Sequence, residues 1–148
     1  MKSLPYHVFI DTNVLINDIL FRQFNRPNSK PSHLALDYLL RVARRETFVA
    51  SFSIVQVLST LERARVSQDI IRQEIQYILT KHTIINFTEK DIQAALDDFS
   101  GLDIEDTFQF VVSQKMRCQY IITENVKDFK PFQNVRIIRP KEIRRIIF

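Results

Sequence analysis

The sequence predicts an α/β fold, a three-layer α/β/α sandwich with a central, mainly parallel sheet. Short β-branched runs alternate with longer segments of helical period, which is the pattern of successive βα units. Hydrophobic residues fill 45% of the 148 positions, enough at this length to form a core. The sequence also shows no internal repeat, low-complexity tract or dividing linker. We therefore expect one domain that spans residues 1–148.

Each element is expected from its own local pattern. Short β-branched runs bounded by polar residues indicate strands, and apolar residues that recur at three- and four-residue spacing indicate helices. The expected strands are 7–10, 47–50, 83–87, 119–122 and 135–138. The expected helices are 14–21, 32–45, 54–64, one that follows Ser67, 88–99, 104–116 and one that Pro140 opens.

Polar residues indicate where several of these helices begin. Ser32 and Ser67 precede helical runs and are expected as N-caps. Thr88 with Asp91 resembles a capping box, in which each side chain bonds to the backbone N–H of the other residue. Residues 22–31, between the first two helices, are rich in Asn, Pro and Ser and are expected to form a long loop.

The composition excludes several kinds of site. An average chain of this length holds roughly ten glycines, but this one has only Gly101, at the turn before the helix 104–116. Phosphate-cradling loops need several glycines, so P-loop and dinucleotide sites are excluded. Cys118 is the only cysteine, which excludes internal disulfides and cysteine zinc sites and favours a reducing compartment, the cytoplasm.

Hydropathy and net charge bear on the partners. No stretch approaches the ~18 uncharged apolar residues of a membrane span, and the first residues lack the pattern of a signal peptide, so no membrane partner is expected. The formal net charge is +4 and the pI is near 9.4. This charge permits binding to a polyanion but is a weak indication of nucleic acid.

Acidic residues follow the expected strands or open a helix beside them. Asp11 ends the first strand, Asp103 and Asp106 share one face of a helical turn with Glu105 rotated away, and residues 123–129 add acids after a later strand. Each acid has a structural alternative, as an N-cap, a helix-terminal charge or a turn residue. Because ligands bind at the carboxyl ends of parallel strands, we expect the three segments to meet at one edge. Carboxylates gathered without His or Cys indicate Mg²⁺ or Mn²⁺, which prefer oxygen ligands.

Three segments together resemble the PIN-domain family of the toxin-like kind. They are residues 8–16 (VFIDTNVLI), 103–107 (DIEDT) and 122–129 (ITENVKDF), and their order and spacing match over nearly the whole chain. The resemblance implies a parallel α/β/α sandwich and a Mg²⁺- or Mn²⁺-dependent ribonuclease that cuts single-stranded or structured RNA. It also implies the toxin half of a toxin-antitoxin pair, with an antitoxin as the protein partner.

The resemblance and the pattern of acids together give the expected site, with Asp11 as the first metal ligand. The expected catalytic residues are Asp11, Asp106 and Asp128. The expected ligands of one or two metal ions are Asp11, Asp103, Asp106 and Asp128. The expected pocket residues are Thr12, Asn13, Gln56, Thr123, Glu124 and Asn125, and the expected RNA contacts are Lys127 and Lys130.

Gln56 departs from the family pattern, which usually has a glutamate early in the helix after the second strand. An amide oxygen can coordinate a cation but carries no charge, so metal binding is expected to be weaker unless Asp103, Glu124 and Asp128 compensate. An alternative function follows, a PIN-fold module with weakened catalysis that binds RNA or a protein partner. Another is a toxin-like subunit whose apolar end, residues 143–148, docks an antitoxin or a second copy in a homodimer, although that end could also fold into its own core.

Overall fold

The structure is a computed structural model that describes residues 7–43, 46–97, 103–129, 132 and 134–146. Five parallel strands form one sheet in the order β3-β2-β1-β4-β5. The strands are β1 (Val8–Ile10), β2 (Thr47–Ala50), β3 (Thr83–Ile85), β4 (Tyr120–Ile122) and β5 (Arg136–Ile138). All of them lie within the ranges expected from the sequence.

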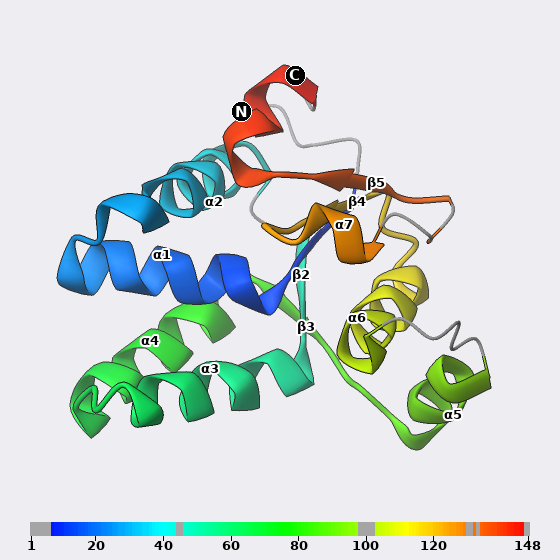
Figure 1. The fold of residues 1–148 in the computed structure, drawn as a ribbon, viewed down its shortest axis with the longest axis horizontal. Coiled ribbons are helices and arrows are strands. Elements are labelled where there is room, and N and C mark those ends of the chain that lie inside the picture. Colours follow the sequence, from blue (N-terminus) through cyan, green and yellow to red (C-terminus); the bar gives the residue numbers. More distant parts are fainter. Residues whose placement is uncertain (1–6, 44–45, 98–102, 130–131, 133, 147–148) are drawn as a thin grey trace.

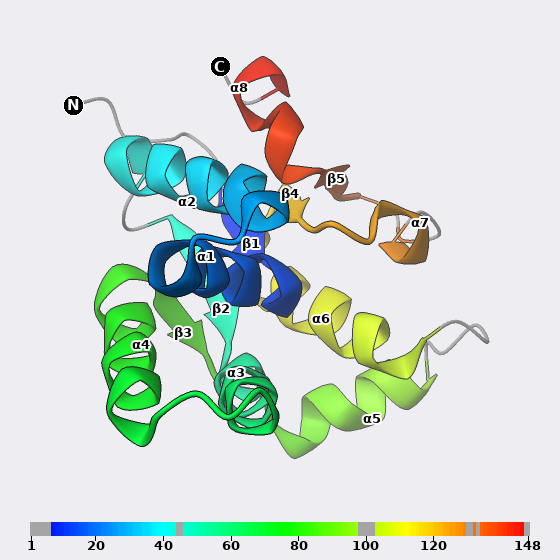
Figure 2. The same cartoon turned by 60° about the vertical axis from the view of Figure 1, so that its left-hand side comes forward.

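Helices cover both faces of this sheet (Figure 1 and Figure 2). One face is packed by α1 (Thr12–Phe24), α2 (Lys30–Ala43), α3 (Ser51–Arg63), α4 (Gln68–Lys81) and α8 (Ile143–Ile146). The other is packed by α6 (Ile104–Lys115) and α7 (Val126–Phe129), and α5 (Glu89–Asp97) lies against α6. Two 3-10 turns, Pro27–Ser29 and Pro140–Glu142, precede α2 and α8. The predicted three-layer sandwich is therefore confirmed.

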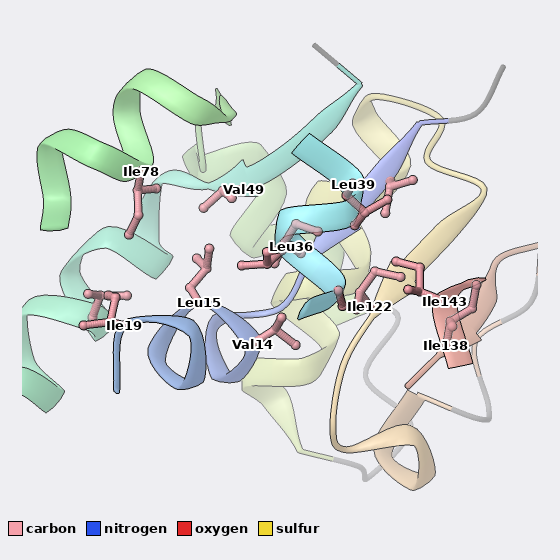
Figure 3. Packing of buried hydrophobic residues seen from close by; sticks show 14 of the residues in the cluster. Val14, Leu15, Ile19, Leu36, Leu39, Val49, Ile78, Ile122, Ile138 and Ile143 are labelled. Atoms are coloured by element: carbon pink, nitrogen blue, oxygen red, sulfur yellow. The ribbon is translucent and has the colours of Figure 1, made fainter. Parts of the chain in front are cut away.

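The strands alternate their side chains between two hydrophobic clusters, as the period of a β-strand requires. Val8, Ile10 and Ile122 are fully buried in the larger cluster, which α1, α2, α3 and α4 complete (Figure 3). Phe9 and Ile121 are fully buried on the opposite face, against α6 and α7. Burial on both faces explains why these strands are continuous hydrophobic runs in the sequence.

The strand order creates a binding position at the carboxyl end of the sheet. The chain builds β2 and β3 outward on one side of β1, then returns and adds β4 and β5 on the other side. In open parallel sheets, ligands bind at such a reversal, just beyond the ends of the two strands that flank it. β1 ends at Ile10 and β4 ends at Ile122, so Asp11 and Thr123 lie at the reversal.

The expected long loop over residues 22–31 is wrong. α1 continues to Phe24 and ends where Asn25 adopts a left-handed backbone with φ of 51°. Asn25 bonds its N–H back to the last turn of α1, which satisfies carbonyl groups that the helix end would leave free. The 3-10 turn Pro27–Ser29 then leads directly into α2. Asn and Pro in this segment therefore mark a tight helix-to-helix connection.

Two further helix starts differ from the expectation. α2 begins at Lys30, because Pro31 is tolerated in a first turn, where its missing N–H needs no partner. Ser32 thus lies inside the helix, and its hydroxyl donates to Glu124 Oε1 at 3.3 Å instead of capping. α3 begins at Ser51, directly after β2, and the acidic segment after β4 contains the short helix α7, where no helix is expected from the sequence.

Other expected caps are confirmed. Ser67 Oγ accepts from the N–H of Ile70 at 3.3 Å. The N–H of Thr88 donates to Asp91 Oδ2 at 2.8 Å, and the N–H of Asp91 donates to Thr88 Oγ1 at 3.4 Å, which completes the capping box. The expected features that lie outside the described residues are the turn at Gly101 and the helix ends at 45 and 99. Within the described ranges, none of the helices has the length and apolar character that crossing a bilayer demands.

Candidate active site at the carboxyl end of the sheet

A pocket of about 760 Å³ lies beyond β1 and β2, where the first turns of α1, α3 and α6 meet. One part of its lining is acidic and polar, and the other is apolar and aromatic. The lining residues are Asp11, Thr12, Asn13, Ile16, Phe52, Val55, Gln56, Ser59, Thr60, Arg63, Phe87, Ile104, Glu105, Asp106, Phe108 and Asn125. This set combines residues from segments that are distant in the sequence, as the pattern of acids predicts.

Asp11 is the most firmly held acid of the pocket. It is the N-cap of α1, with Oδ1 accepting from the N–H of Thr12 at 2.7 Å. Its Oδ2 accepts from Thr123 Oγ1 at 2.7 Å and from Asn13 Nδ2 at 3.0 Å. Burial raises the pKa of Asp11 to about 6, although the bonds from Thr123 and Thr12 favour the charged form. Asp11 is therefore both a helix cap and a buried carboxylate whose charge is poorly compensated.

Asp106 lies in the first turn of α6, and Asp103 sets the start of that turn. Asp103 Oδ1 accepts from the N–H of Glu105 at 2.8 Å and from the N–H of Asp106 at 3.2 Å, so Asp103 acts as the N-cap. Burial, followed by repulsion from Asp11 and Asp103, raises the pKa of Asp106 to about 7. Two carboxyl groups of this pocket thus have pKa values well above the ordinary range.

Glu105 also lines the pocket, so the expectation that it is rotated away is wrong. Gln56 explains its position, because the Gln56 amide donates to Glu105 Oε1. The oxygen of the same amide accepts from Thr12 Oγ1 at 2.5 Å. Gln56, at the place of the expected acid, therefore connects α1 to α6 and holds a carboxylate from another helix in the pocket.

A buried network of polar side chains, which the sequence did not indicate, adjoins the hydrogen bonds of Gln56. The Thr12 hydroxyl is 2.7 Å from Ser53 Oγ and accepts from Gln109 Nε2 at 2.9 Å. Gln109 is 1% exposed, and among the described residues its Oε1 has no hydrogen-bond partner. Ser53 lies in the first turn of α3 and Gln109 in the second turn of α6, where nothing in the sequence distinguishes a buried polar residue from an exposed one.

The remaining expected residues lie around the pocket or away from it. The Thr123 hydroxyl donates a hydrogen bond to Asp11. Asn125 lines the pocket, and its backbone N–H donates to Thr123 Oγ1 at 3.0 Å. Asp128 is exposed on α7 and outside the lining, but its charge still raises the pKa of Asp11. Glu124 points elsewhere, because it accepts from Ser32 and lines a different cavity.

The two lysines expected to contact RNA are not brought into the pocket. Lys127 is exposed on α7 and is absent from the lining residues. Lys130 lies outside the described residues. The basic side chain that does line the pocket is Arg63, at the last turn of α3.

The atoms that could coordinate a metal ion in the acidic part are carboxylate, amide and hydroxyl oxygens. Such a set suits hard divalent cations better than zinc, which favours nitrogen and sulfur ligands. Within the part of the chain that the structure describes, no three carboxylate, imidazole or thiol groups lie close enough together to hold a metal ion between them. In the same ranges, no lysine or arginine forms an ion pair with Asp11, Glu105 or Asp106.

The chain has a relative of similar sequence among known proteins. No protein-family model matches the chain. Among curated proteins, the chain is similar to ribonuclease VapC1 of Aquifex aeolicus (strain VF5). The two are 29% identical over 132 residues, which cover 84% of this chain and 85% of the relative.

Solved structures share the fold over nearly their whole length. A toxin-antitoxin complex from Klebsiella pneumoniae matches with a TM-score of 0.62 and 23% identity, over 90% of this chain and 97% of that chain. VapC20 of Mycobacterium tuberculosis, a sarcin-ricin loop cleaving toxin, matches with a TM-score of 0.63 and 15% identity, over 87% and 98%. VapBC2 of Rickettsia felis, bound to a promoter DNA fragment, matches with a TM-score of 0.62 and 17% identity, over 89% and 97%. With the curated relative, these likenesses confirm the resemblance to PIN-domain toxins.

Proposed function

We propose that this chain, which resembles the PIN-domain toxins, is a divalent-metal-dependent ribonuclease that hydrolyses phosphodiester bonds in RNA. The observation that carries the proposal is the convergence of Asp11, Glu105 and Asp106 on one pocket. Burial and the neighbouring negative charges raise the pKa of Asp11 and of Asp106. A bound divalent cation would offset both effects. The similarity to a curated ribonuclease supports the same activity.

Mg²⁺ or Mn²⁺ fits the donors of the acidic part. We assign Asp11 and Asp106 as the principal ligands, and Glu105 as a third carboxylate that shares their pocket. The charges of Asp103 and Asp128 both act on Asp106, so these exposed acids would add to the attraction for a cation. Mg²⁺ commonly binds through one or two carboxylates and completes its shell with waters and substrate phosphates. A closed cage of side chains is therefore not required.

A metal ion bound here would lower the pKa of a bound water and neutralise charge that develops on the phosphoryl oxygens. The chain itself supplies orientation. Thr12, Asn13 and Thr123 fix both oxygens of Asp11, so that carboxylate is held in place before substrate arrives. Gln56 holds Glu105 in the pocket in the same way. No side-chain nucleophile is part of the proposal.

We also propose an antitoxin as the protein partner, because the chain is similar in fold to subunits of toxin-antitoxin complexes. We propose the cytoplasm as the compartment, because the single cysteine favours a reducing environment. A homodimer is a further proposal, for which Ile143 of the apolar end is not available. Ile143 is 3% exposed and packs into the larger hydrophobic cluster, so it is used within the chain.

A second candidate function is a PIN-fold module that binds RNA or a partner with weakened catalysis. Gln56 favours it, because the neutral amide stands where the family usually has a glutamate, and its hydrogen bonds to Thr12 and Glu105 are already made. Loss of one negative charge near a divalent cation weakens its binding. Glu105 would offset this loss only if it reaches the cation.

Cleavage of RNA with Mg²⁺ or Mn²⁺ tests both candidates. We expect the wild type to cut RNA, EDTA to stop it, and Asp11→Asn to lower the rate at least about a hundredfold. The matched control is Asp37→Asn, which removes an exposed carboxylate on α2. Equal rates for Asp11→Asn and the wild type would overturn the proposed site. An inactive wild type with an active Gln56→Glu variant would favour the binding module.

A further inference from the structure

One wall of the pocket is built on one face of α3. Phe52, Val55, Gln56, Ser59, Thr60 and Arg63 all line the pocket, at spacings of three and four residues. From the first to the last of them this face spans eleven residue steps, or about 16 Å at the rise of an α-helix. The pocket therefore continues along α3, away from the acids and toward Arg63.

Three phenylalanines surround the start of this extension. The ring centroids of Phe52 and Phe87 are 4.7 Å apart, and those of Phe87 and Phe108 are 4.8 Å apart. All three rings are only partly buried. They come from α3, from the segment after β3 and from α6, so tertiary packing alone brings them together.

Val55 lies beside these rings and is 63% exposed, more than any other large hydrophobic residue that the structure describes. We call Phe52, Val55, Phe87 and Phe108 the aromatic arm. Apolar surface of this kind, next to a polar site, is typical of a binding groove.

We propose that the aromatic arm is a subsite for one unpaired nucleobase of the RNA, next to the bond that is cut. The inference rests on the proposed function, because that function places a phosphate at Asp11 and Asp106, in the pocket that the arm also lines. Aromatic rings accept any base by stacking, whereas a base inside a duplex is already stacked and paired. Arg63 would contact a backbone phosphate at the far end of the same face, since guanidinium groups pair well with phosphate. The arm therefore requires the nucleotide beside the cut bond to be unpaired.

With cations bound at its acids, the pocket suits a nucleotide better than a peptide segment. A polar pocket next to an apolar arm offers both parts of a nucleotide a partner, because the acids would hold cations that bind phosphate and the rings would hold the base. Arg63 adds a positive charge along the same line. A protein segment in the arm is the competing outcome, and the experiment separates the two.

The test measures kcat and KM for a short single-stranded oligoribonucleotide. Val55→Glu places a negative charge in the arm at an exposed position and is expected to raise KM about tenfold or more. The matched control is Leu79→Glu, at a position on α4 that is 48% exposed and outside the pocket, which should leave kcat and KM unchanged. Phe108→Leu keeps apolar volume but lacks a ring, and it should raise KM about tenfold. Phe108→Tyr keeps the ring and should have the KM of the wild type.

A binding assay keeps this inference separate from the proposed activity. A single-stranded RNA that carries 2-aminopurine should lose fluorescence when its base stacks in the arm of the wild type. The loss of fluorescence should be smaller with Phe108→Leu. With Phe108→Tyr it should equal that of the wild type. One outcome is that the wild type cuts RNA while Val55→Glu and Phe108→Leu have the same KM and the same fluorescence loss as the wild type. In that case the arm does not bind a base, and the proposed function stands. If the wild type does not cut RNA but quenching depends on the ring of Phe108, the proposed function fails and the subsite stands. A duplex bound and cut as well as the single strand would overturn the subsite.

Discussion

Replacing Asp106 with asparagine is expected to stabilise the metal-free protein above neutral pH. The folded chain raises the pKa of Asp106 to about 7, against 3.8 for an ordinary aspartate, so the charged form is less stable in the fold than in the unfolded chain. At 1.36 kcal/mol for each tenfold change in proton affinity, this difference corresponds to at most about 4 kcal/mol. Asp106 is only partly buried, and solvent screening reduces the expected gain to about 1–2 kcal/mol.

The sign of the pH dependence follows from proton binding. Between pH 4 and pH 7 the folded state holds more protons at Asp106 than the unfolded state does, so stability falls as pH rises. The asparagine side chain of the variant would carry no charge at any pH, so the stability of the variant would not fall in this way. The wild type and Asp106→Asn should therefore have similar stabilities near pH 4 and differ most above pH 7.

Urea unfolding in EDTA at pH 4.5 and pH 8 measures the effect, with Asp37→Asn on the surface of α2 as the control. Millimolar Mg²⁺ should then raise the melting temperature of the wild type at pH 8 but not that of Asp106→Asn. An Asp106→Asn variant that is no more stable than the wild type at pH 8 in EDTA would refute the charge effect. An equal gain in stability at pH 4.5 and at pH 8 would also refute it.

Three further predictions concern other charged and polar groups. Glu74→Ala should lower the free energy of unfolding by about 3 kcal/mol, because it breaks a buried ion pair, while Asp37→Ala in an exposed pair should cost under about 1 kcal/mol. Burial lowers the pKa of His82 to about 4, so stability should fall as pH drops from about 6.5 to 4, and thermal melts of His82→Gln should lack that loss. Gln56→Glu should lower the Kd for Mn²⁺ about tenfold by calorimetry, and should lower the metal-free melting temperature because the new carboxylate would face Glu105.

The sequence predicts the sheet and several caps well, because these depend on local pattern. The strands β1, β2 and β4 are buried throughout, β3 and β5 are short runs rich in isoleucine, and Ser67 and the pair Thr88 and Asp91 cap their helices through bonds to residues three positions away. Asp11 at the end of β1 is also found from position, since parallel strands place their carboxyl ends together. These features require no knowledge of distant contacts.

What the sequence does not predict depends on contacts between distant segments. The position of Glu105 is set by Gln56, a residue 49 positions earlier, and helical spacing within α6 alone gives the opposite expectation. The loop expected at 22–31 is a tight connection instead, in which α1 continues to Phe24, a 3-10 turn follows, and Arg22 binds Glu74 on α4. The aromatic arm likewise exists only after three segments pack together. Gln56 itself was the available signal, since a neutral amide at this place needs an acceptor for its N–H groups.

The most direct test of the account follows Mn²⁺ binding and RNA cleavage together. Bound Mn²⁺ is measured by electron paramagnetic resonance while the cleavage rate is recorded at each concentration. We expect the wild-type rate to rise in proportion to the bound Mn²⁺ and to vanish in EDTA, and Asp11→Asn to lose both binding and cleavage because it removes a buried charge at the centre of the pocket. Cleavage by Asp11→Asn at the wild-type rate, or cleavage by the wild type in EDTA, would contradict a carboxylate-held metal as the source of activity.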